Sequence, residues 1–146
     1  MLMLLFKLQE DAYAIDSTKV IEVIPYLNTQ KIPMTPNYIP GMANYRGNPI
    51  PVIDLGQLIN GLPCQQRMST RIILTSLTMG GEIKKIVGLL AENVTETIKT
   101  PKGWLLKPSE KGPVFLDNDV TGHPMVRLFQ PEQMLPEDLP GLSFVE

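Results

Sequence analysis

The chain has 146 residues, of which 43% are hydrophobic and 19% are charged, and its formal net charge is −2. That length accommodates one domain with a buried core, and the composition is typical of a globular protein, not of a disordered or membrane-embedded one. The near balance of charge argues against a broad electrostatic grip on nucleic acid. The lone cysteine, Cys64, excludes an internal disulfide, and the apolar start is too short for a signal sequence, so we expect a single cytoplasmic domain over residues 1–146.

Fourteen prolines and eleven glycines, spread along the chain, favour short strands and frequent turns, so a mainly β fold is expected. Residues 2–15 consist of two apolar runs around a polar turn, which predicts a β-hairpin. Residues 16–18 offer N-cap side chains, and the apolar spacing over 20–24 predicts either a short helix or a helix-to-strand switch. The prolines over 25–40 exclude a long helix there.

An apolar, β-branched run predicts a strand from Ile50 to Leu55, and Pro51 within it indicates an edge or irregular position. Asp54 is placed to cap the short apolar turn that follows, which Asn60-Gly61 ends.

The pair Gly80-Gly81 separates two strand-like runs, residues 72–74 and 85–90, and so predicts a second hairpin, after which residues 95–98 continue extended. Further on we expect, in chain order, a loop over 101–113 with Trp104 folded back on the core, a strand over 114–116, a turn at 118–119, a strand over 125–129, a short closing helix over 131–135 and a loosely held tail over 136–146.

The sequence contains no recognisable catalytic or metal-binding set. Cys64 and His123 stand in unrelated contexts, which argues against both a zinc site and a Cys-His nucleophile pair. Gly80-Gly81 lacks the spacing and the following Lys-Ser/Thr of a phosphate-binding loop. We therefore expect no enzyme activity, no cofactor and no metal.

Two side chains of opposite charge stand out. Arg46 lies in a stretch flanked by Gly41 and Gly47, directly before the strand that begins at Ile50. Glu22 is set between large apolar neighbours. Two interpretations of Glu22 are open at this point: it belongs to an exposed strand or helix face, or it forms a structured ion pair with Arg46.

This succession of segments resembles the CheW family of chemotaxis coupling proteins over about the first two thirds of the chain. The most specific segment is Gly41 to Leu55, where an Asn-x-Arg-Gly step leads into an apolar Pro-Val-Ile-Asp-Leu strand. Tyr45 stands where the family usually has leucine. The other similar segments are the opening hairpin, Val20–Val23, Ile39–Pro40, Arg71–Ile73 and Val87–Val94.

The resemblance implies two five-stranded, SH3-like β-barrel lobes that share a core, with few and short helices. It also implies a non-enzymatic adaptor that links the cytoplasmic tip of methyl-accepting chemoreceptors to the C-terminal regulatory region of a CheA-type histidine kinase. The receptor-facing positions of the family match Val20, Glu22, Gly41, Asn44 and Arg46. In that interpretation Arg46 is the charged anchor, Glu22 holds its guanidinium in place and Val20 adds apolar contact area.

A different class remains as an alternative: a small β-barrel that binds single-stranded nucleic acid. Such a protein needs a basic groove interleaved with aromatic side chains, whereas this chain is slightly acidic and only 6% aromatic. No run of apolar residues approaches the length of a membrane span, so direct membrane insertion is not expected.

Overall fold

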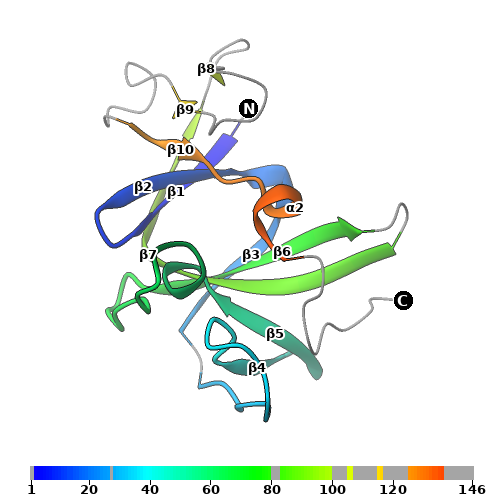
Figure 1. The fold of residues 1–146 in the computed structure, drawn as a ribbon. Helices are drawn as coiled ribbons and strands as arrows, with labels where there is room; N and C mark the ends of the chain where they lie inside the picture. The colour runs from blue at the N-terminus through cyan, green and yellow to red at the C-terminus, as the bar shows by residue number, and fades with distance from the viewer. Residues whose placement is uncertain are drawn as a thin grey trace.

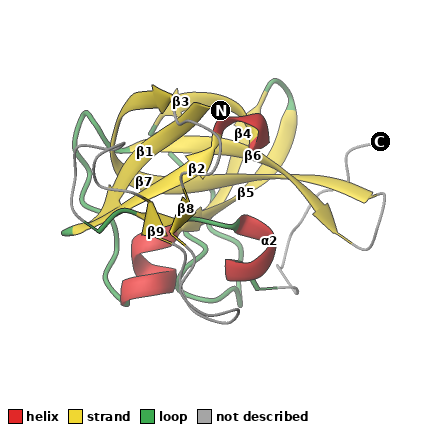
Figure 2. Cartoon of the chain, turned by 90° about the horizontal axis from the view of Figure 1, so that it is seen from above, coloured by secondary structure: helices red, strands yellow, loops and turns green. Residues whose placement is uncertain are grey.

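The computed structural model describes residues 2–26, 28–79, 83–99, 105–106, 115–116 and 125–136, and within them the fold is mainly β, as predicted (Figures 1 and 2). The strands are β1 (Leu2–Leu8), β2 (Asp11–Asp16), β3 (Val20–Pro25), β4 (Gly41–Tyr45), β5 (Asn48–Asp54), β6 (Arg71–Met79), β7 (Ile83–Lys99), β8 (Leu105–Leu106), β9 (Phe115–Leu116) and β10 (Arg127–Leu128). The helical segments are η1 (Ser17–Lys19), η2 (Gly56–Asn60) and α2 (Pro131–Met134).

The long strand β7 belongs to both halves of the molecule. Its residues 83–91 pair antiparallel with β6, and its residues 92–99 pair antiparallel with β1. The first lobe therefore has the strand order β3–β6–β7–β5–β4, and the second has the order β7–β1–β2–β10–β9–β8. Figure 1 shows β1, β2 and β10 on one side of the molecule and β4 and β5 on the other.

Among the residues that the structure describes, these pairings form one continuous ten-stranded sheet. Within the described residues, no backbone hydrogen bonds pair β3 with β4 or β8 with β7. The two lobes are therefore SH3-like, but there they do not close into the expected five-stranded barrels. The first lobe has the five strands that were predicted. The second lobe adds β8, β9 and β10, and β10 runs parallel to β2.

Both lobes contribute to one main core. Successive side chains of a strand point to opposite faces, so Leu4, Phe6 and Leu8 of β1 enter the main core while Met3 and Leu5 enter a smaller cluster behind it. Within the main core the rings of Phe6, Tyr13 and Phe129 pack together, with centroids 5.7–6.4 Å apart. Other buried members of this core come from β5, β6 and β7: Val52, Ile53, Ile72, Ile73, Leu74, Leu77, Val87, Leu89 and Leu90.

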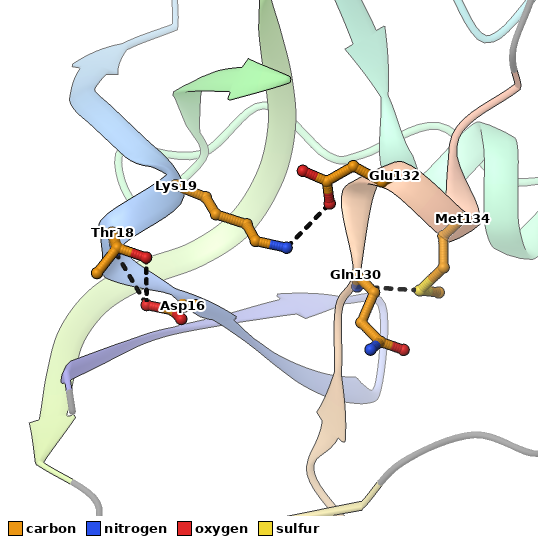
Figure 3. A network of polar contacts seen from close by, with 6 residues as sticks. All are labelled: Asp16, Thr18, Lys19, Gln130, Glu132 and Met134. Atoms are coloured by element: carbon orange, nitrogen blue, oxygen red, sulfur yellow. Dashed lines mark hydrogen bonds and ion pairs between the residues drawn. The ribbon is translucent and has the colours of Figure 1, made fainter. Parts of the chain in front are cut away.

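The closing helix α2 is present, as predicted, and it lies against this core. Leu135, which follows it, is buried, and Met134 packs against the main cluster. An ion pair between Lys19 Nζ and Glu132 Oε2, 2.9 Å long, joins α2 to η1, directly before β3 (Figure 3). The chain end of the described part is thereby tied to the start of the first lobe.

Several local predictions are confirmed and two need correction. The hairpin over 2–15 is present, with Leu8 opposite Asp11, and so is the hairpin between β6 and β7, with Met79 opposite Ile83. Over 20–24 the chain is a strand; only the preceding turn, η1, is helical, because pairing with β6 begins at Val20. The loop expected over 101–113 contains the short strand β8.

Some predictions lie outside the described residues: the Gly80-Gly81 turn itself, Trp104, the turn at 118–119, His123 and the tail beyond residue 136. Where the structure describes the chain, it contains no helix with the length and apolarity that a membrane crossing requires.

Candidate functional site

Arg46 occupies the tip of a tight hairpin between β4 and β5. Tyr45 pairs with Asn48, so Arg46 and Gly47 form a two-residue turn, with φ of 51° and 84°. Positive φ at both positions is the pattern of a type I′ turn, which matches the twist of the flanking strands. The left-handed conformation costs a non-glycine residue on the order of 1 kcal/mol, and Asn44 Oδ1 offsets part of that by accepting the Gly47 N–H over 2.9 Å.

Glu22 faces this hairpin tip from β3. Its Oε2 accepts a hydrogen bond from the Tyr45 hydroxyl over 2.5 Å and lies 3.4 Å from Arg46 Nη2. The Arg46 guanidinium carbon lies 5.1 Å from the centre of the Tyr45 ring, a cation–π contact. Of the two interpretations of Glu22, the ion pair with Arg46 is therefore present, and the carboxylate is also partly exposed, at 40%.

The electrostatics of this cluster follow from these contacts. The hydrogen bond to Glu22, with partial burial, raises the pKa of the Tyr45 hydroxyl above its ordinary value, and the Arg46 charge opposes that rise. Tyr45 is thus a neutral donor at physiological pH. The Arg46 side chain is 75% exposed, so most of its donors face solvent.

This Glu22–Tyr45–Arg46 cluster spans the open seam of the first lobe. β3 and β4 are the two end strands of that lobe, and side chains connect them where the backbone does not. The charged group of β3, Glu22, and that of the turn after β4, Arg46, are therefore held at the same surface point.

Gly41 has a structural reason to be glycine. It is buried at the start of β4, and a Cβ there would lie 2.3 Å from the Gln30 carbonyl oxygen. Gln30 and the neighbouring Met42 exchange two backbone hydrogen bonds, of 2.9 and 2.8 Å, which hold the 28–31 segment against β4. Gly41 therefore lies within strand β4 and not in the turn that holds Arg46.

The remaining predicted site residues divide between core and surface. Val20 is half-buried and packs against the main core, while its neighbour Ile21, at a bulge in β3, is 45% exposed. Asn44 is exposed beside the turn. The structure thus brings Glu22 and Arg46 into contact and bonds the Asn44 side chain to the turn that holds Arg46, whereas Val20 and Gly41 lie partly or fully within the fold.

A hollow of about 390 Å³ lies beside the hairpin, between β4 and the 28–30 segment. Its lining includes three amide side chains and comprises Asn28, Gln30, Met42, Ala43, Asn44, Gly47 and Pro49. Amide groups both donate and accept hydrogen bonds, so this hollow suits a polar group of a partner.

Cys64 is buried and unsuited to nucleophilic chemistry. Burial raises the pKa of its thiol strongly, and the nearby Asp54 carboxylate adds to the effect. Asp54 instead organises the local backbone: it accepts the N–H of Gln57 over 3.1 Å, as predicted for a cap, and the N–H of Cys64 over 3.2 Å. Among the described residues, no three Cys, His, Asp or Glu side chains gather as metal ligands would.

Sequence reasoning missed the role of Tyr45. Tyr45 stood out in the sequence only because the family usually has leucine there. A tyrosine hydroxyl directly beside Arg46 was the signal that could have indicated a polar contact at this site. The contact with Glu22 joins residues 23 positions apart in the chain, and no local pattern encodes that distance.

The fold and the site together define a small mainly β protein, made of two SH3-like lobes on one shared strand, that presents an exposed arginine at the tip of a tight hairpin. The CheW-like domain family model matches residues 2–135, and the chain belongs to this family. The expected family is thereby confirmed.

Individual relatives and a solved structure point to the same family. The chain is 30% identical over 95 residues to the chemotaxis protein CheW of Helicobacter pylori, covering 64% of this chain and 54% of the relative. It is 24% identical over 124 residues to the chemotaxis protein CheW of Thermotoga maritima, covering 78% and 82%. The crystal structure of the scaffolding protein TtCheW from Thermoanaerobacter tengcongensis superposes with a TM-score of 0.76 at 25% identity, covering 97% of this chain and 93% of that one.

A relative from Klebsiella aerogenes, also named chemotaxis protein CheW, is 30% identical over 95 residues and is covered to 54%. The matches thus span about half the length of the Helicobacter and Klebsiella relatives.

Proposed function

We propose that this protein is a non-enzymatic adaptor that couples methyl-accepting chemoreceptors to a CheA-type histidine kinase in the cytoplasm, in chemotaxis or a related chemosensory pathway. Support comes from the family and from relatives that are named chemotaxis proteins and, in one case, a scaffolding protein. We take residues 1–146 as a single domain, because β7 is shared by both lobes.

The observation that carries the proposal is the presentation of Arg46. Its turn has only two residues, its backbone holds an unfavourable left-handed conformation, and its guanidinium is mostly exposed while in contact with Tyr45 and Glu22. Such backbone strain is found where a side chain must be aimed. A planar guanidinium held in this way suits the carboxylates or exposed carbonyls at the tip of a receptor helix hairpin.

The other receptor-facing residues have separate parts in this proposal. Glu22 orients Arg46, Asn44 and the amide-lined hollow receive polar groups, and Val20 adds apolar contact area. Gly41, being buried, acts by allowing the close approach of Gln30. The kinase is proposed to bind a different surface through its C-terminal regulatory region, to which we assign no residues.

The nucleic-acid alternative is not favoured by this geometry. Arg46 shares its site with the carboxylate of Glu22, whereas a single-strand binder lines its groove with several cations and stacking rings.

Co-sedimentation of the chain with a receptor cytoplasmic tip and the C-terminal half of a CheA-type kinase tests the proposal. Arg46→Glu should abolish receptor binding and leave the thermal unfolding midpoint nearly unchanged, because the side chain is mostly exposed. Arg67→Glu is the matched control: Arg67 is also exposed and bonds to Gln65, away from the cluster, so this variant should bind normally. Absence of binding by the parent chain would refute the adaptor role.

A further inference from the structure

The two donors that share Glu22 Oε2 are unequal. The Tyr45 hydroxyl approaches to 2.5 Å, within the range of a strong charge-assisted O–H···O⁻ bond, while Arg46 Nη2 stays at 3.4 Å, long for a hydrogen bond. Tyr45 is thus the principal partner of the carboxylate. Arg46 contributes mainly charge to this pair, and its side chain remains 75% exposed.

The ring of Tyr45 has a second contact with the same arginine. The guanidinium lies over its face at 5.1 Å, and Tyr45 itself is half-buried against the main core. Because the ring packs against the core, its position is fixed by contacts other than those with Arg46. The ring keeps the guanidinium at the surface without requiring a close ion pair.

We propose that Tyr45 is a positioning residue that keeps Arg46 available to an acidic side chain of the partner. The inference rests on the proposed function, since it concerns the receptor-facing arginine. The Tyr45 hydroxyl satisfies Glu22, so the guanidinium donors are left for a partner carboxylate. Without that hydroxyl, the side-chain donor remaining to Glu22 within the described structure is Arg46, and the two would close into a tighter pair with which the partner must compete.

Binding of the receptor tip, measured by titration calorimetry, tests the proposal through Tyr45→Phe, which keeps the ring and removes the hydroxyl. We expect its Kd to rise about two- to fivefold, the size of effect typical of a partly exposed ion pair. Tyr45→Leu, which also removes the ring, should raise it further. Tyr38→Phe is the control, because Tyr38 is likewise half-buried and its hydroxyl makes no hydrogen bond within the described residues, so the Kd of this variant should not change.

A spectroscopic readout separates positioning from a general structural effect. In the free protein, the NMR signals of the Arg46 Nη hydrogens should be averaged by rotation in the parent and separate in Tyr45→Phe, where a close pair with Glu22 hinders rotation. If the parent binds the receptor tip and Tyr45→Phe equals it in Kd and in these signals, the inference is overturned and the adaptor role stands. If the parent does not bind while the signals change as expected, the adaptor role is overturned and the control of Arg46 by Tyr45 stands.

Discussion

Tyr45 and Glu22 connect the two end strands of the first lobe through a single side-chain hydrogen bond of 2.5 Å. Each partner is anchored by its own ladder, Tyr45 through β5 and Glu22 through β6. The seam that carries the proposed receptor site is therefore made of side chains on two well-supported strands. Substitutions of Glu22, Tyr45 or Arg46 should therefore change binding more than folding.

The pair Glu22 and Arg46 should be weakly coupled in folding stability. Both side chains are partly or mostly exposed, so we expect a coupling free energy of at most about 1 kcal/mol in a cycle of Glu22→Gln and Arg46→Gln. The cycle built from Glu22→Gln and Tyr45→Phe should give the larger coupling, because that contact is shorter. Denaturant unfolding provides the values, and strictly additive losses in both cycles would contradict the pairing.

Gly41→Ala should destabilise the fold by about 2 kcal/mol or more, because an added Cβ meets backbone atoms of Gln30 that cannot rotate away. Gly47→Ala is the comparison. Its φ of 84° is also left-handed, but nothing lies within 4 Å of the new Cβ, so the cost should be limited to about 1 kcal/mol. Equal losses in urea unfolding would show that Gln30 moves aside freely.

Stability should fall as the pH rises above about 9, with Cys64 contributing. The pKa of this thiol is raised by burial above its ordinary 9.0, so in alkali the unfolded chain releases the proton while the folded chain keeps it. The free energy of unfolding then decreases with pH, by at most about 1.4 kcal/mol per pH unit for one group. Cys64→Ala should unfold with a shallower dependence between pH 9 and 10.5, and an unchanged slope would contradict a buried neutral thiol.

The ion pair between Lys19 and Glu132 should make a small, salt-sensitive contribution to stability. It ties α2 to η1 (Figure 3), but both side chains are 35% exposed. Glu132→Lys should therefore lower the free energy of unfolding by no more than about 1 kcal/mol, with a smaller difference in 1 M salt. Adding Lys19→Glu to that variant should restore most of the loss. If the double variant does not regain the lost free energy of unfolding, the loss comes from altered packing of α2 and not from the ion pair.

Much of the fold was predictable because its signals are local. Apolar runs bounded by turn residues located β1, β2, β5, β6 and most of β7, and the proline and acid at the start of α2 located the closing helix. The segment around Arg46 was specific enough to indicate the family. The helix considered over 20–24 is absent because helical spacing over two turns is also compatible with a strand, and pairing with β6 decided between them.

The sequence by itself determined the mainly β class, the family, the exposed arginine at a glycine-containing turn and the candidate acidic partner. Tertiary structure alone decided that β7 is one 17-residue strand shared by two lobes, that the first lobe stays open between β3 and β4, and that Tyr45 takes the closer place at Glu22. The reason is physical: propensity, alternation and turn chemistry act within a few residues, whereas these features depend on contacts between segments far apart in the chain, which only packing of the whole sheet specifies.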